Sequence, residues 1–166
     1  MEKKVIRTLN VYYYGVMLLT LVVGFLVNFL VDKGHLSTID MDSTLGTNLQ
    51  IAIMIDALLT IPLGLSLCKR RCVKLSSLTD ENLKLKGYLK AAKWRIILVS
   101  NTMLFAFVAN SMLVRPITEE SSTPAPRITT MMALVAVSAI AWWFTKPSEG
   151  KMQLELEPKD SNQEQY

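Results

Sequence analysis

Histidine and cysteine are scarce in this sequence, which contains one His and two Cys. His35 is the only imidazole, so no Ser-His-Asp set can be built inside an apolar segment, and no glycine-rich phosphate loop is present. Cys68 and Cys72 are two thiols, whereas a closed structural zinc site needs four ligands. The sequence therefore predicts a protein that is not an enzyme and holds neither a cofactor nor a metal.

Charged residues are nearly absent from four long stretches, at about 9–31, 48–68, 94–114 and 128–145. Each approaches the roughly 20 residues that a helix needs to cross the hydrocarbon core of a bilayer. Little apolar sequence remains outside them to build a separate soluble core. The sequence predicts an all-α polytopic membrane protein, with four transmembrane helices bundled in residues 1–146 and a polar cytoplasmic tail at 147–166.

Basic residues are unevenly distributed between the predicted connections. Three lie in the N-terminal segment, nine between spans two and three, and three in the C-terminal tail, whereas the other two connections hold three altogether. Because Lys and Arg are retained on the cytoplasmic side, both termini should be cytoplasmic. The cluster "CKRRCVK" is then a topology signal rather than a nucleic-acid site. The residues expected to contact lipid headgroups are Lys69, Arg70, Arg71, Lys74, Lys86, Lys90, Lys93 and Arg95.

The connection between spans two and three predicts an amphipathic cytoplasmic helix at about 79–93. Ser77 or Thr79 could cap its start, and apolar residues then recur every three or four positions as far as Ile96. The pattern continues into span three, so the helix and the span should be continuous or abut sharply. We also expected weak, salt-sensitive contacts between its lysines and the acids of the tail, Glu149, Glu155, Glu157 and Asp160.

One acid, Asp56, lies near the middle of the second apolar stretch. Steps of four from Asn48 to Cys68 meet only small or polar residues, which predicts that Asp56 faces a neighbouring helix along a seam of small side chains. Similar steps occur in span one (Thr20, Gly24, Asn28) and in span three (Thr102, Ala106, Asn110).

Depth along the spans suggests which polar groups could meet Asp56. At 1.5 Å per residue, Asp56 lies roughly 12 Å inward from the outer end of span two, and Thr20 and Ser138 lie roughly 15 Å inward. We therefore predicted an intramembrane polar cluster, either structural or ion-handling, that also includes Thr60. Its members are Asp56, Thr20, Asn28, Asn110, Ser138 and Thr60.

Three roles remain open for Asp56: it could fix helix register, handle protons or cations, or contact another membrane subunit. The favoured interpretation is a non-enzymatic membrane protein that acts as a small accessory or partner-binding subunit. The alternative is a small oligomeric transporter, coupled to protons or cations, built around Asp56. Expected partners are the lipid bilayer and a membrane protein or a second copy of the chain. The short connections fit a bacterial inner membrane.

Overall fold

The computed structural model describes residues 2–114 and 130–157. They form five helices, α1 (Glu2–Asp32), α2 (Thr44–Ser76), α3 (Glu81–Met112), α4 (Thr130–Trp143) and α5 (Glu149–Leu156). Two short strands, β1 (Ile39–Asp40) and β2 (Leu113–Val114), pair in parallel. The predicted all-α class is confirmed.

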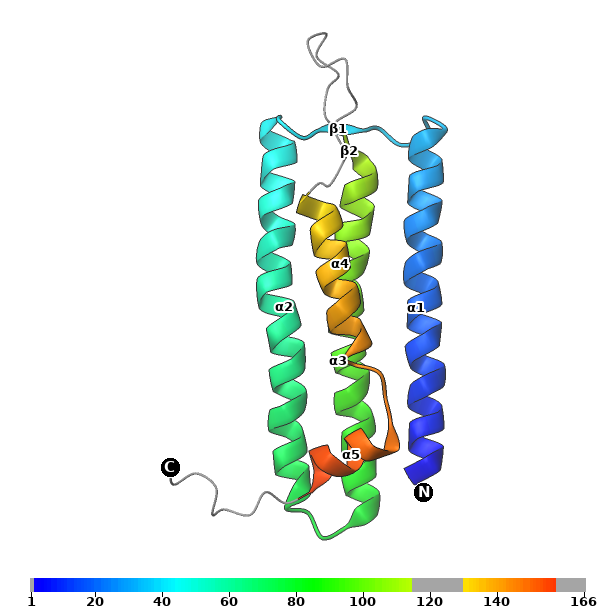
Figure 1. Cartoon of the computed structure of the whole chain (residues 1–166), viewed down its shortest axis with the longest axis vertical. Coiled ribbons are helices and arrows are strands. Elements are labelled where there is room, and N and C mark those ends of the chain that lie inside the picture. The colour runs from blue at the N-terminus through cyan, green and yellow to red at the C-terminus, as the bar shows by residue number, and fades with distance from the viewer. Residues whose placement is uncertain (1, 115–129, 158–166) are drawn as a thin grey trace.

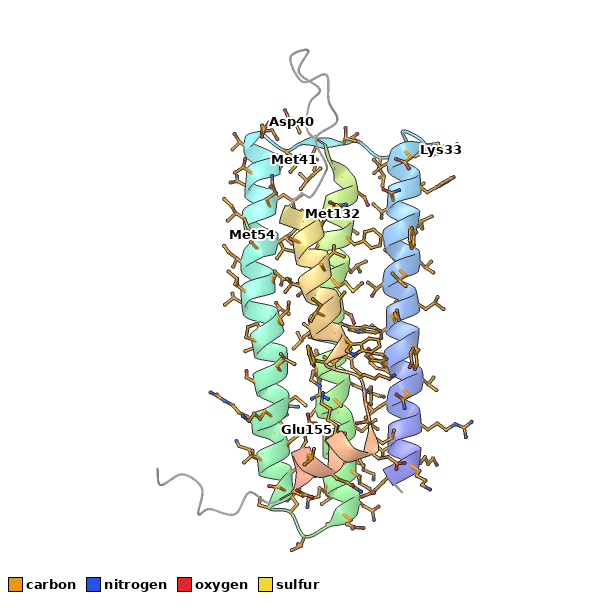
Figure 2. All side chains as sticks on the ribbon, in the orientation of Figure 1. Lys33, Asp40, Met41, Met54, Met132 and Glu155 are labelled. Atoms are coloured by element: carbon orange, nitrogen blue, oxygen red, sulfur yellow. The ribbon has the colours of Figure 1, made fainter. Side chains whose placement is uncertain are left out.

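Helix α3 is the central element of the molecule. It packs against α1, α2 and α4, whereas α1 and α2 hardly touch one another. Figure 1 shows α1 and α2 on opposite sides of α3, with the shorter α4 between them and α5 crossing below. The β1–β2 pair lies at one end of the molecule, the strand end, and Figure 2 shows Lys33 and Asp40 there and Glu155 near the opposite end, the α5 end.

Three helices are long and apolar enough to cross a membrane: α1, α2 and α3. Their 31, 33 and 32 residues correspond to about 46–50 Å, against about 30 Å for the hydrocarbon core. Many of their large apolar side chains are exposed, including Leu18, Phe25, Leu58 and Leu59. Such a surface is typical of lipid contact, so the chain is a membrane-embedded protein.

The predicted fourth span corresponds to α4, which has 14 residues. At 1.5 Å per residue α4 is about 21 Å long, which is less than the hydrocarbon thickness. Three spans therefore follow from helix length alone. Tyr13 on α1 stacks on Trp142 near the end of α4, with ring centroids 3.9 Å apart, and this contact joins the two helices.

The predicted cytoplasmic helix is the first part of α3, continuous with the third predicted span as the periodicity indicated. Its N-cap is Asp80 rather than Ser77 or Thr79, because the Asp80 carboxylate accepts hydrogen bonds from the amides of Asn82 (2.8 Å) and Leu83 (3.3 Å). Gly87 leaves room for Leu75 of α2, since a Cβ there would lie 2.3 Å from that side chain. Gly87 thus permits close packing of α2 on α3 near their connection.

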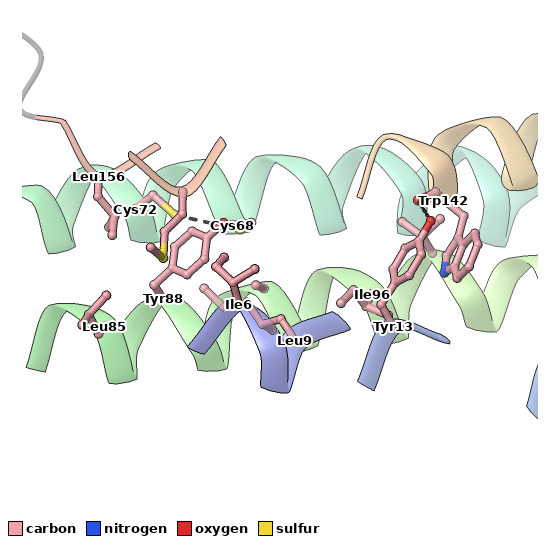
Figure 3. Close-up of a cluster of buried hydrophobic side chains, with 14 residues drawn as sticks. Ile6, Leu9, Tyr13, Cys68, Cys72, Leu85, Tyr88, Ile96, Trp142 and Leu156 are labelled. Carbon is pink, nitrogen blue, oxygen red and sulfur yellow. Dashed lines mark hydrogen bonds between the residues drawn. The ribbon is translucent and has the colours of Figure 1, made fainter. Parts of the chain in front are cut away.

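The tail after residue 146 differs from the polar segment that we expected. Ser148 caps α5 by accepting a hydrogen bond from the Lys151 amide (3.2 Å), and Met152 and Leu156, one turn apart, are buried. They join the larger of two apolar clusters, shown in Figure 3, which lies toward the α5 end. The smaller cluster, around Met131 and Ala106, lies toward the strand end. Residues 158–166, including Asp160, lie outside the described part.

Candidate functional site

Asp56 lies at the contact between α2 and α3. Thr60, one turn further along α2, donates a hydrogen bond to Asp56 Oδ1 (2.8 Å), and Thr102 of α3 donates one to Oδ2 (3.1 Å). Thr102 is fully buried, whereas Asp56 and Thr60 are half-buried. Both carboxylate oxygens are therefore engaged, and the acid joins two helices, as the seam predicted.

The predicted seam of small side chains faces a neighbouring helix along only half of α2. Gly64 and Cys68 are buried, and the Cα of Gly64 faces Leu98 so closely that an added Cβ would lie 3.3 Å from it. At the other end, Asn48 and Ala52 are exposed. A step of four residues exceeds one helical turn of 3.6 by about 40°, so five such steps rotate by about 200° around the helix. A stripe of six therefore cannot face one neighbour.

The predicted partners on α1 do not reach Asp56. The Thr20 hydroxyl is buried and donates to the carbonyl of Val16 (2.9 Å), within its own helix. Asn28 is exposed and its amide donates to Asp32 Oδ2 (3.3 Å). The prediction of a cluster spanning α1 and α2 was wrong, because α3 separates these helices.

The remaining predicted members lie on α4 and α3. Ser138 is fully buried, and its hydroxyl has no hydrogen-bond partner among the described residues. Asn110 is half-buried near the strand end of α3. Of the six residues predicted to cluster, Asp56 and Thr60 are joined by a hydrogen bond, and Thr102 is an added third member.

Seven of the eight basic residues expected to contact lipid headgroups have accessible positions. Lys69, Arg70, Arg71, Lys74, Lys86 and Lys90 are exposed, and half-buried Lys93 places its Nζ 5.2 Å from the ring centre of Tyr12.

Arg95 is the exception, and the headgroup prediction is wrong for it. Its side chain is 4% exposed, and Arg95 Nη1 lies 2.7 Å from Glu155 Oε1 on α5. The tail acid therefore meets a buried guanidinium rather than the lysines that we expected. Burial, and then the positive charge of Arg95, lower the pKa of nearby Lys151.

Sequence reasoning missed both Thr102 and the Arg95–Glu155 pair. Thr102 was recognised as part of the small-residue stripe of span three. It was left out of the predicted cluster because its depth in the membrane, relative to Asp56, was estimated wrongly. No local sequence pattern predicts an ion pair between residues that are 60 positions apart. Only the burial of α5 brings Glu155 to Arg95.

No protein-family model, curated protein or solved structure matches the chain.

Proposed function

We propose that the chain is a four-span membrane protein with both termini in the cytoplasm. Residue 114 pairs with Asp40 at the strand end, whereas α5 packs on α2 at the other end. The chain between them must therefore return along the molecule, and α4 lies on that path with exposed apolar residues such as Val137 and Ile140. The distribution of basic residues supports a cytoplasmic α5 end, in a membrane such as the bacterial inner membrane.

This topology predicts opposite reactivity for two introduced cysteines. Ser37 and Thr79 are exposed and lie in connections at the two ends. In a background with both native cysteines replaced by Ala, Ser37→Cys should react with an impermeant maleimide applied to sealed cells. Thr79→Cys should react only after permeabilisation. Labelling of Thr79→Cys in sealed cells would overturn the orientation.

Within the membrane, the protein acts as a non-enzymatic subunit that binds another membrane protein. The observation that carries this proposal is an open face of α3, the α3 stripe, formed by Trp94, Ile97, Asn101 and Phe105, all exposed. Their spacing of three, four and four places them on one side of the helix. Although α3 packs against three helices, this side remains uncovered among the described residues.

Asn101 places a polar amide in the α3 stripe, and contact with lipid hydrocarbon would leave that amide without a hydrogen-bond partner. It lies about 17 Å from the strand-end terminus of α3, well inside a hydrocarbon core of about 30 Å. Its amide has no hydrogen-bond partner among the described residues, and an unpaired amide in hydrocarbon costs free energy. A helix of a partner protein could bond it, for about 0.6–2 kcal/mol.

The transporter alternative would need a water path to Asp56. Both oxygens of that carboxylate accept hydrogen bonds, and Asp56 lines neither the cavity beside Cys68 nor the cavity beside Leu85. These observations favour a structural role for Asp56.

Photocrosslinking tests the partner-binding proposal. A photoreactive amino acid at Phe105, on the α3 stripe, should yield a discrete protein adduct in native membranes. The same group at Leu58, which is 74% exposed on α2, should label lipid. Asn101→Leu should lower the adduct yield at 105 by roughly 3- to 30-fold, equivalent to about 0.6–2 kcal/mol. Lipid adducts alone at both positions would contradict the proposal.

A further inference from the structure

Three potential metal ligands converge at the α5 end. Cys68 and Cys72 project from successive turns of α2, and Glu155 approaches them from α5. Their sulfur and oxygen atoms all lie within 4.8 Å of one another, and all three residues are buried or half-buried. Figure 3 shows the two thiols within the apolar cluster, beside Tyr88.

The two sulfurs have the separation of a metal chelate. Cys68 Sγ and Cys72 Sγ are 3.9 Å apart. Two thiolates bound to one tetrahedral zinc at about 2.3 Å are separated by about 3.8 Å. Because a spacing of four residues places both side chains on one face of a rigid helix, the pair needs little rearrangement to chelate an ion.

Glu155 has one oxygen free for a metal. Arg95 Nη1 donates to Oε1 at 2.7 Å, whereas Oε2 is buried and has no hydrogen-bond partner among the described residues. Arg95 Nε and Nη2 are likewise buried and unpaired. Such a carboxylate, fixed through one oxygen and open at the other, is how proteins orient a metal ligand. Buried polar atoms of this kind commonly bind an ion or an ordered water.

Space for a fourth ligand adjoins the Cys68 thiol. A cavity of about 110 Å³ is lined by Cys68, Arg95, Arg71, Trp94 and Gly64, among others. One water occupies about 30 Å³ of liquid, so the cavity can hold the solvent ligand that a three-residue site leaves open.

Charge balance permits a divalent ion despite the neighbouring guanidinium. Without metal, two neutral thiols accompany the opposite charges of Arg95 and Glu155. Binding forms two metal–sulfur bonds as two thiol protons leave for solvent, so a 2+ ion replaces two protons and no electron is transferred. The net charge of the buried cluster is therefore the same before and after binding.

We propose that Cys68, Cys72 and Glu155 bind one thiophilic divalent cation of the zinc class, with water as the fourth ligand. This site revises the conclusion that two cysteines are too few, because α5 supplies a ligand and the cavity supplies solvent. The ion fastens the C-terminal helix to the end of α2.

Cobalt(II) provides a spectroscopic test on the full-length protein in detergent, stripped of metal and held reduced by a phosphine. The wild type should bind one Co²⁺ per chain, with the visible bands of tetrahedral coordination and a thiolate-to-cobalt charge-transfer band. Cys68→Ser and Cys72→Ser should each abolish the charge-transfer band of the chelate. Glu155→Gln should keep thiolate contact but weaken affinity by at least about tenfold.

Glu149→Gln is the matched control, since Glu149 is exposed in the first turn of the same helix and should leave binding unchanged. Limited proteolysis gives a second measurement: Zn²⁺ should protect α5 in the wild type and in Glu149→Gln, but not in Cys72→Ser. Absence of a charge-transfer band in folded wild-type protein would overturn the site. Wild-type affinity in Glu155→Gln would remove the carboxylate from it and overturn the three-residue proposal.

Discussion

Glu155→Ala should lower the melting temperature in detergent and release α5. Arg95 is 4% exposed, so removing its partner leaves a buried guanidinium without a counter-charge. Breaking one side of such a pair typically costs about 3–5 kcal/mol. Release of α5 would let water reach Arg95 and would limit that cost, so protease cleavage within Glu149–Leu156 should rise together with the loss of stability.

Two comparisons make this result specific to the ion pair. Glu157→Ala, at an exposed position just beyond α5, should change stability by no more than about 0.5 kcal/mol. Replacing both partners, Arg95→Met with Glu155→Leu, should recover much of the loss, because apolar packing then replaces two buried charges. If Glu155→Ala and Glu157→Ala melted alike, the ion pair would contribute little to the stability of the protein.

Asp56→Leu should destabilise the contact between α2 and α3, by about 1–2 kcal/mol, because Thr102 loses its acceptor in the interface. Asp56→Asn should be milder. The Asn carbonyl can still accept from Thr60, and the Asn NH2 group can donate to the Thr102 hydroxyl, which then donates to the carbonyl of Leu98, 3.4 Å away. Thermal unfolding in detergent measures both effects.

Proton flux in liposomes separates this structural role from transport. If Asp56 only joins two helices, wild type, Asp56→Asn and protein-free liposomes should conduct protons equally. A transporter would lose flux in Asp56→Asn while keeping its melting temperature, because Asn cannot release a proton. Wild-type flux that disappears in this way would make the structural account untenable.

The long helices could be predicted because their signal is local. Apolar stretches and the stripe from Leu85 to Ile96 are periodic within one segment, and the structure keeps them in α1, α2 and the continuous α3. Helix ends were harder to predict. Depth for Asp56 was counted from residue 48, but α2 begins at Thr44, which moves Asp56 to about 18 Å and close to the level of Thr102 at about 15 Å.

The predicted polar cluster failed for a different reason, namely the order of helices in space. Sequence depth says how far along a span a residue lies, but not which helix is its neighbour. Thr20 and Asp56 lie at similar depth and yet α3 stands between their helices. The Arg95–Glu155 pair was equally hidden, since neither charge belongs to a periodic pattern that identifies its partner.

Helices α1, α2 and α3 are each long enough to extend through the hydrocarbon of a bilayer and into water. About 16–20 Å of each exceeds the hydrocarbon thickness, and in the topology that we propose this excess projects at the α5 end, where α5 covers the larger apolar cluster. In water the hydrophobic effect drives the burial of apolar side chains. Within lipid the same effect does not favour packing of one helix against another. Because α3 is one continuous helix, packing of Leu85 and Tyr88 in water would, in this topology, set the direction in which Asn101 points within the bilayer.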